Sequence, residues 1–279
     1  MTCALIPAGE LMYQTHWGLT QSPFGSSFDA RFFYESPTHE EALARLNFLV
    51  EQRRRLGLML GPPGSGKSLL LELFAVAQRR AGRAVARVAL AGREPAEVLA
   101  ELLGQLRRPA SPDEPTALLW RRLDDCLAER RFEQTPVVLL LDDADRAGLA
   151  VGPLLERLVR YDPLPEMRLT IALAAEPKNL ARLDHRLLDL VELRIDLEPW
   201  LTEATADYVR TVLSQAGRRE PLFDDSAIER LHQLTGGIPR RVAQLADLAL
   251  LAGAGAEAEQ VGADTIDAVH QELSGAAVC

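Results

Sequence analysis

The stretch that decides the fold is the apolar run Leu56-Gly57-Leu58-Met59-Leu60, followed directly by Gly61-Pro62-Pro63-Gly64-Ser65-Gly66-Lys67-Ser68. The second segment has the Walker A spacing, in which a glycine is followed after four residues by Gly-Lys-Ser. Its surroundings also suit a phosphate-binding loop, because a short buried strand is predicted before it and a helix over residues 67–81 after it. This order of strand, glycine-rich loop and helix predicts a P-loop NTPase.

The residue types in this loop suit a nucleotide phosphate. Glycines lack a Cβ, so the backbone can turn tightly and direct several N–H groups at one anion. The following helix presents the positive end of its dipole to that anion. Lys67 is expected to reach the β- and γ-phosphates, and the Ser68 hydroxyl to bind Mg²⁺. Lys67 and Lys178 are the only lysines in the chain, which makes a chance match rare. We therefore predict that ATP is held by a loop in which Ser68 also binds Mg²⁺: Gly61, Pro62, Pro63, Gly64, Ser65, Gly66, Lys67 and Ser68.

A second motif is the apolar run Val137-Val138-Leu139-Leu140-Leu141, which ends in Asp142-Asp143 and has the Walker B form. Because buried parallel strands end at one edge of a sheet, Asp142 is expected beside the phosphate loop, where it orients Mg²⁺. Asp143 is the candidate for polarising the attacking water. Asp145 is a weaker substitute and is expected to cap the next turn.

Strand and helix patterns alternate through the first two thirds of the chain. Short apolar runs at 56–60, 84–90, 137–141, 168–174 and 190–195 predict buried strands. Helical patterns lie between them at 67–81, 95–106, 115–132, 153–161 and 177–183, after an earlier helix at 38–54. Such alternation predicts an α/β fold with a five-stranded parallel sheet flanked by helices.

After Pro199 only helical patterns remain, at 202–216, 224–234, 239–251 and 263–273, with a connecting loop expected at 252–258. The sequence therefore predicts three parts. Residues 1–55 form an N-terminal segment that packs on the ATPase core, 56–198 form the nucleotide-binding α/β domain, and 199–279 form a smaller all-α lid.

Composition limits the class of protein. The chain has 279 residues, with 47% hydrophobic and 25% charged residues, which is ordinary for a globular protein. Its net charge is −9, and from Leu197 onward six arginines stand against thirteen acidic residues. This balance argues against a protein that coats nucleic acid. Cys3, Cys126 and Cys279 are too few and too scattered for a disulfide framework or a zinc site. With no signal peptide or membrane span in the pattern, a cytoplasmic location is expected.

Beyond the two Walker motifs, several blocks resemble the AAA+ ATPases, and among them the ExeA-like (general secretion pathway protein A) family. The resemblance covers nearly the whole chain. The blocks that carry it are Trp17-Gly18-Leu19, Pro23-Phe24, residues 29–34 and 36–43, and Leu234-Thr235-Gly236-Gly237-Ile238-Pro239-Arg240-Arg241. The last block resembles the sensor-2 segment of that family's helical lid.

The resemblance implies roles for two arginines. Arg240 would contact the γ-phosphate from the lid and report its presence. Arg186, in Leu183-Asp184-His185-Arg186, aligns with the family's arginine finger, which is supplied to a neighbouring subunit. Arg182 and Arg194 compete for that role.

The resemblance also has implications for the adenine contact and for sensor 1, the polar residue that the family places near the phosphates. His39 and the run Phe32-Phe33-Tyr34 fall where the family packs its N-terminal segment against the adenine, although core packing is an equal reading of these aromatics. The family places a polar sensor-1 residue after the fourth strand. Here Glu176 occupies that place, and a glutamate would repel a phosphate, so the sensor-1 assignment stays open.

One departure concerns Asp143, because the family carries glutamate at this position. The shorter side chain would set the carboxylate about 1 Å short of the water, which slows hydrolysis.

The leading interpretation is an oligomerising AAA+ ATPase that uses ATP with Mg²⁺ to rearrange a protein partner.

Two alternatives remain. One is a nucleotide-switched, DNA-associated adaptor of the transposition-helper type, using the arginines at 53–55, 79–83 and 107–108. The other is a small-molecule P-loop kinase, which the paired acids and the Gly-Gly-Ile-Pro-Arg block disfavour.

Overall fold

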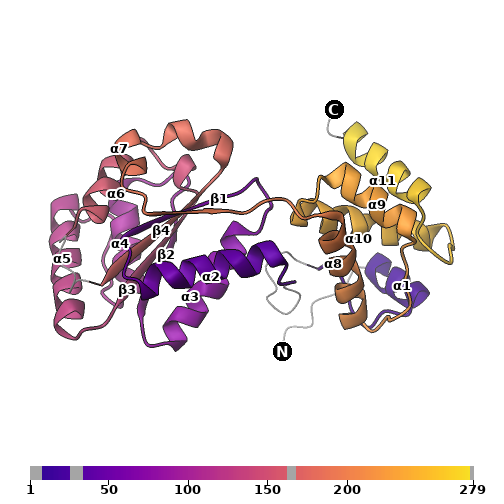
Figure 1. Ribbon diagram of the computed structural model, residues 1–279, viewed down its shortest axis with the longest axis horizontal. Helices are drawn as coiled ribbons and strands as arrows, with labels where there is room; N and C mark the ends of the chain where they lie inside the picture. Colours follow the sequence, from indigo (N-terminus) through magenta and orange to yellow (C-terminus); the bar gives the residue numbers. More distant parts are fainter. Residues whose placement is uncertain (1–7, 26–33, 162–167, 277–279) are drawn as a thin grey trace. The chain divides into compact units, whose positions relative to one another are not determined.

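The computed structural model describes residues 8–25, 34–161 and 168–276 (Figure 1). The chain divides into two compact units. The first, the α/β unit, comprises His39–Glu198. The second, the helical unit, combines Met1–Thr38 with Pro199–Cys279, so the chain passes from one unit to the other twice.

Five parallel strands form the sheet of the α/β unit, in the order β2-β3-β4-β1-β5. The strands are β1 (Leu56–Leu60), β2 (Ala84–Ala89), β3 (Val137–Asp142), β4 (Leu169–Ala175) and β5 (Leu193–Asp196). Leu60 pairs with Ala175, and Leu141 pairs with Leu173, so β1, β4 and β3 end at nearly the same level. The phosphate loop after β1 and the acids after β3 therefore meet at one edge, with β4 between them. This confirms the predicted five-stranded parallel sheet.

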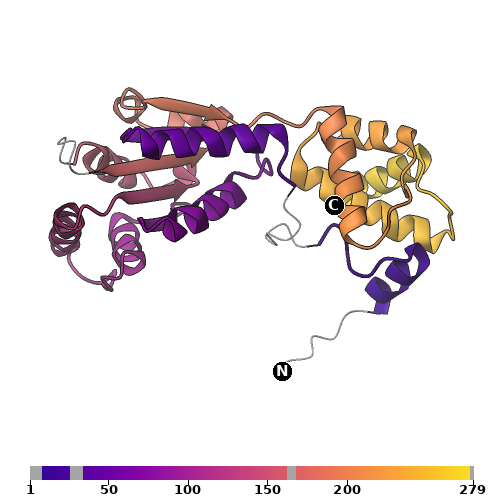
Figure 2. The ribbon, with the colours of Figure 1, turned by 60° about the horizontal axis from the view of Figure 1, so that its bottom comes forward.

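Helices cover both faces of the sheet, as the alternating pattern predicts. Leu58 and Leu60 of β1 face the core formed with α4 (Pro95–Gln105), α5 (Thr116–Phe132) and α6 (Val151–Val159). The opposite face is covered by α2 (Pro37–Glu51) and α3 (Lys67–Arg80), which Figure 2 shows lying along the sheet. Gly57 allows the close approach of α2, because a Cβ there would lie 2.7 Å from Leu49 Cδ2.

Cys126 of α5 is buried in the core, and burial raises the pKa of its thiol. It is therefore a packed thiol. Cys3 and Cys279 lie outside the described residues.

The helical unit is built from α8 (Thr202–Gln215), α9 (Asp225–Thr235), α10 (Pro239–Gly255) and α11 (Ala263–Ala276). The sequence pattern identified all four, but it ended α10 too early. The predicted loop at 252–258 is wrong up to Gly255, because the alanines of this segment favour helix and continue α10. Among the described residues, no helix is long and apolar enough to cross a membrane.

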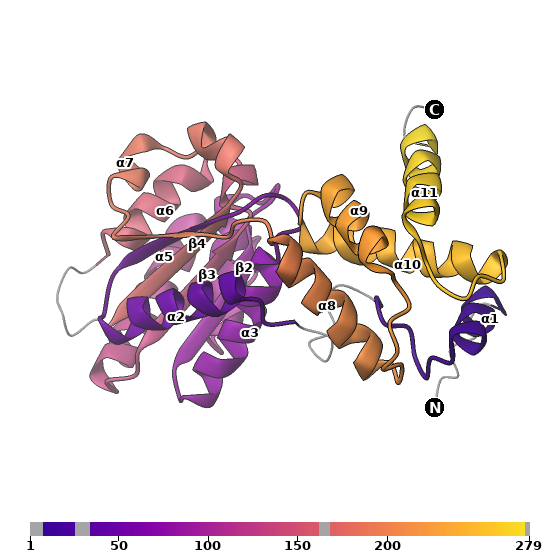
Figure 3. The ribbon, with the colours of Figure 1, turned by 45° about the vertical axis from the view of Figure 1, so that its right-hand side comes forward.

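The N-terminal segment joins the helical unit, which corrects the expectation that residues 1–55 pack on the ATPase core. Figure 3 shows α1 (Ala8–Trp17), which the sequence analysis did not predict, beside α10. Trp17 is 2% exposed, and its Nε1–H donates to Leu250 O at 2.8 Å. Within the span 1–55, the α/β unit contains only the residues from His39 onward, most of them in α2.

A second contact fixes the segment just before α2. The indole N–H of Trp200 donates to Ser36 Oγ at 2.9 Å, and both residues are buried. The backbone N–H of Trp200 donates to Gly237 O at 2.9 Å. Trp200 therefore joins the N-terminal segment to the turn that precedes α10.

The packing of α1 on α10 predicts different effects for two glycines of the same helix. A Cβ at Gly253 would lie 2.9 Å from Trp17 Cζ2, whereas a Cβ at Gly255 would meet nothing within 4 Å. Gly253→Ala should lower the free energy of unfolding of the helical unit by about 1–3 kcal/mol through overpacking. The control Gly255→Ala should leave it unchanged or raise it by up to about 1 kcal/mol. Urea denaturation followed by circular dichroism measures both, and equal effects would contradict the contact.

Candidate functional site

The phosphate loop begins where β1 ends. The N–H of Gly61 donates to Ala175 O of β4 at 3.3 Å, which holds the start of the loop to the sheet. Gly64 and Gly66 have φ angles of 86° and 97°, in the left-handed region that favours glycine. Gly66 is also the residue from which α3 starts, so the free N–H groups of the first helical turn lie at the end of the loop. The geometry is that of an anion-binding loop joined to a helix N-terminus.

Lys67 lies inside this loop. Its side chain is largely buried, and Nζ donates to Gly61 O at 2.7 Å and to Pro62 O at 3.1 Å. Burial lowers the pKa of Lys67, and this effect is opposed by nearby carboxylates. Those carboxylates are Glu176, Asp142, Asp143 and Asp145. One cation is therefore placed among four acidic groups at the same sheet edge.

Asp142 ends β3 and is 3% exposed. Its Oδ2 accepts from Arg87 of β2 at 3.4 Å, and the same guanidinium donates to Glu72 of α3 at 3.1 Å. Arg87 thus connects the Walker B aspartate to the helix that follows the phosphate loop. No motif in the sequence points to Arg87, although a charged residue within an otherwise apolar strand pattern at 84–89 is a signal for a buried or functional charge.

Asp143 follows in the left-handed region, with φ 52° and ψ 41°, a conformation that few non-glycine residues adopt. Its N–H donates to Asp142 Oδ1 at 3.0 Å. Burial raises the pKa of Asp143, and the charge of Asp142 raises it further. A carboxyl with a raised pKa accepts a proton more readily than an ordinary aspartate does, which suits a proton acceptor.

Asp145 is expected from the sequence to cap the next turn, but its side chain instead bonds to the segment after β4. It is 2% exposed, and its carboxylate accepts from Glu176 N at 3.3 Å and from Asn179 Nδ2 at 2.8 Å. These bonds join the segment after β3 to the segment after β4. Asn179 lies in the 3₁₀ helix η4 (Pro177–Arg182) and also approaches Glu176 Oε2 at 3.3 Å. Asn179 carried no signal in the sequence, because its role depends on this contact between segments.

His39 lies in the α/β unit and contacts the phosphate loop directly. The ring is 4% exposed, and Nε2 lies 2.9 Å from Ser65 O. Tyr34, which the family resemblance groups with it near the adenine, belongs instead to the helical unit, where its ring packs against Trp200 and Tyr208. Phe32 and Phe33 lie outside the described residues. Of the described residues in this group, Tyr34 and His39, the structure shows His39 bonded to the phosphate loop.

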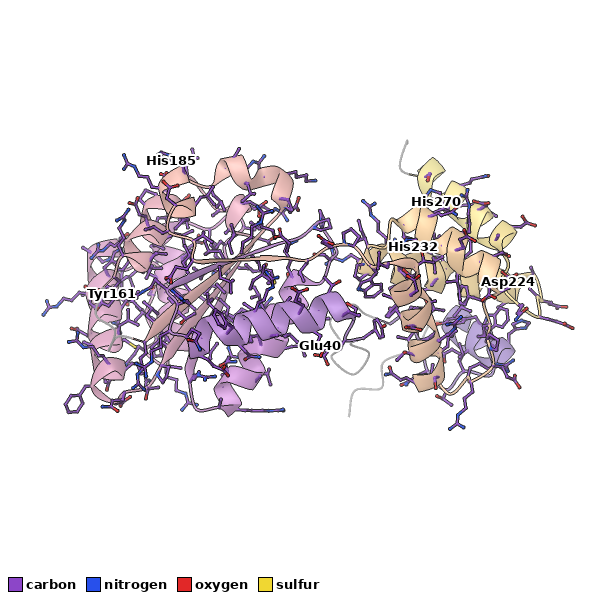
Figure 4. All side chains as sticks on the ribbon, in the orientation of Figure 1. Glu40, Tyr161, His185, Asp224, His232 and His270 are labelled. Atoms are coloured by element: carbon purple, nitrogen blue, oxygen red, sulfur yellow. The ribbon has the colours of Figure 1, made fainter. Side chains whose placement is uncertain are left out.

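Arg186 stands on the short helix α7 (His185–Leu188), whose N-terminus is capped by Asp184. Arg186 and Arg182 are both exposed. Figure 4 labels the neighbouring His185, whose side chain is also exposed, at the outside of the α/β unit. Arg194, by contrast, is engaged in an ion pair with Asp196 at 2.8 Å. The hydrogen bond to Asp196 raises the pKa of the Arg194 guanidinium.

Arg240 belongs to the helical unit. Pro239 is the first residue of α10, and Arg240 follows it as an exposed side chain. The preceding turn needs Gly237, because its φ is 67° and a Cβ there would lie 2.2 Å from Trp200 O. The Gly-Gly-Ile-Pro block therefore forms a turn that packs against the backbone of Trp200. The contact of Arg240 with a phosphate stays a prediction.

The residues present fit a magnesium nucleotide. Mg²⁺ is usually bound by one or two protein oxygens together with phosphates and water. Asp142 and Ser68 supply such oxygens, and among the described residues no group of three or more metal-binding side chains offers an all-protein cage. Ser65 Oγ is buried without a hydrogen-bond partner in the described part of the chain, so the loop has a further polar atom to satisfy.

Comparison with known proteins agrees with this arrangement. The family described as "AAA domain" matches residues 50–183. General secretion pathway protein A of Aeromonas hydrophila is 27% identical over 268 residues, which cover 95% of this chain. The match covers 49% of that protein, so this chain spans about half the length of that relative.

Solved structures share the fold at low sequence identity. The Aeropyrum pernix ORC1 protein, solved in complex with DNA, has a TM-score of 0.64 and 17% identity, over 88% of this chain and 68% of that one. Cdc6p of Pyrobaculum aerophilum has a TM-score of 0.64 and 19% identity, over 86% and 67%. The RuvB Holliday junction branch migration motor of Thermotoga maritima has a TM-score of 0.59 and 15% identity, over 90% and 73%. From the phosphate loop, the sheet order and these matches, we conclude that the chain has a P-loop NTPase fold, that residues 50–183 are similar to the AAA domain family, and that almost the whole chain is similar to General secretion pathway protein A.

Proposed function

We propose that this protein binds ATP with Mg²⁺ and hydrolyses it, and that nucleotide state controls the assembly of a homo-oligomer and the rearrangement of a partner protein. The observation that carries the proposal is the position of Lys67, buried in a phosphate loop and surrounded by the acids that follow β3 and β4. We place this activity in the cytoplasm, where ATP and Mg²⁺ are supplied.

In this proposal the phosphate loop performs the binding step. Backbone N–H groups of residues 61–68 hold the β-phosphate, and Lys67 moves from the loop carbonyls to the β- and γ-phosphates. Ser68 and Asp142 would hold the Mg²⁺, which would supply positive charge against the phosphates. Arg87 keeps Asp142 in place through their ion pair.

Asp143 serves the chemical step. Its carboxylate orients a water and accepts the proton as the water oxygen bonds to the γ-phosphorus and the bond to ADP breaks. The raised pKa of Asp143 helps this transfer, while the short side chain limits it. Arg240 from the helical unit and Arg186 from a neighbouring subunit would stabilise the charge of the transferred phosphoryl group.

The charge of the two units favours a protein partner over DNA. The helical unit carries 7 basic and 15 acidic residues, a net of −8, whereas the α/β unit carries 24 and 25, a net of −1. Two of the arginines that the DNA-adaptor alternative requires, Arg54 and Arg108, pair with Glu192 and Glu129. These clusters therefore give that alternative weak support.

Lys67→Ala should weaken ATP binding by roughly 10- to 100-fold, because it removes charge-assisted hydrogen bonds to phosphate. Isothermal titration calorimetry with Mg²⁺-ATP measures this. The matched control is Lys178→Ala, which removes the other lysine, an exposed residue paired with Glu176. Equal affinity in all three proteins would contradict the assignment of the phosphate loop.

Asp143→Asn should keep ATP affinity but lower kcat by about 10²- to 10⁴-fold, because the amide cannot accept the proton. Asp143→Glu should raise kcat, by up to about 100-fold, if the shorter arm limits turnover. Asp113→Asn, at an exposed position, serves as the control. Phosphate release assays measure all three, and normal turnover in Asp143→Asn would transfer the role to another group.

Arg186→Ala should lower turnover by about 10³-fold in the assembled protein, because an arginine finger stabilises transition-state charge. Arg182→Ala, at a nearby exposed position, should have little effect. Mixing Arg186→Ala with Lys67→Ala protein should restore part of the activity, since each supplies what its neighbour lacks. Failure of every mixing ratio to restore activity would argue against a shared site.

A further inference from the structure

The contact between His39 and the phosphate loop has a direct geometric consequence. His39 is the third residue of α2, next to Glu40, which Figure 4 labels. Its Nε2 lies 2.9 Å from the carbonyl oxygen of Ser65. A carbonyl only accepts hydrogen bonds, so the proton of the ring must be on Nε2 for this bond to form.

The Ser65 carbonyl and the Gly66 N–H belong to the same peptide group. In a trans peptide these two groups point in opposite directions. Because the Ser65 oxygen is held by His39, the Gly66 N–H is turned away from α2. Within the described part of the chain this N–H has no protein acceptor, so it is available to an anion.

Gly66 is matched to this neighbour. Its φ of 97° lies in the left-handed region, and a Cβ at this position would lie 2.9 Å from His39 Nε2. The imidazole therefore occupies the space that any other residue at position 66 would need. The bond and the close contact together fix one orientation of the Ser65–Gly66 peptide.

We infer that His39 is a positioning residue of the phosphate loop: by holding the Ser65 carbonyl, it directs the Gly66 N–H toward the bound β-phosphate. This inference rests on the proposed binding of ATP at the loop. It differs from the adenine contact that the family resemblance implies, because it assigns His39 to the phosphates and makes its effect independent of the base.

The test compares Mg²⁺-ATP with Mg²⁺-tripolyphosphate, which has the phosphates but no base, by isothermal titration calorimetry. His39→Met removes the N–H at similar volume, whereas His39→Gln retains an N–H near the place of Nε2. His39→Met should bind both ligands about tenfold more weakly or worse, since one hydrogen bond to a charged group is lost. His39→Gln should recover most of the affinity for both.

Three outcomes would overturn the inference. Unchanged binding in His39→Met excludes a positioning role, and equal losses in the Met and Gln variants assign the ring to packing alone. A loss for ATP but not for tripolyphosphate assigns it to the adenine. The proposed function is judged separately, since wild-type protein that binds neither ligand would overturn both proposals, whereas Lys67→Ala tests the loop without involving His39.

A measurement on the wild-type protein covers the case in which the variants do not fold. Nitrogen-15 NMR of labelled histidine reports which ring nitrogen carries the proton. The His39 signal should show a proton on Nε2 that exchanges slowly with solvent, because the ring is 4% exposed. A neutral ring with its proton on Nδ1 alone could not donate to Ser65 and would overturn the inference.

Discussion

The structure of the site depends on a balance of charge around one buried ammonium group. Lys67 is largely removed from water, and removing a cation from water disfavours its charged form. Four carboxylates oppose that effect without cancelling it, and two backbone carbonyls accept hydrogen bonds from Nζ. In this protein the arrangement arises because the carboxyl ends of β1, β3 and β4 lie at one edge of the sheet. The parallel sheet is therefore what allows acids from β3 and β4 to surround a lysine that follows β1.

The local features of the fold could be predicted from the sequence. The strand β1 and the start of α3 agree with the pattern because the apolar run and the glycine-rich loop are contiguous signals. The same holds for β3 with Asp142 at its end. The end of α10 was mispredicted because small residues read as a linker, although alanine is the best helix former.

The contacts that complete the site could not be predicted, because they join residues that are distant in the chain. Arg87 and Asp142 are 55 residues apart, and Asp145 and Asn179 are 34 apart. Neither pair has a spacing that a motif would record. The association of α1 with α10 is another such case, since Trp17 and Leu250 are 233 residues apart in the chain. Motifs thus predict the candidate catalytic and binding residues, such as Asp142. The residues that position them, such as Arg87, are seen only in the folded structure.

The short segment from Ser36 to His39 is anchored at both ends. Ser36 accepts the indole N–H of Trp200, and His39 bonds to the loop at Ser65. Three peptide links join these two residues, and even fully extended they span at most about 11 Å. Trp200 in turn holds Gly237, three residues before Arg240. The first crossing of the chain between its two units thus falls within this segment, and each end of the segment is held by one side-chain hydrogen bond inside its own unit.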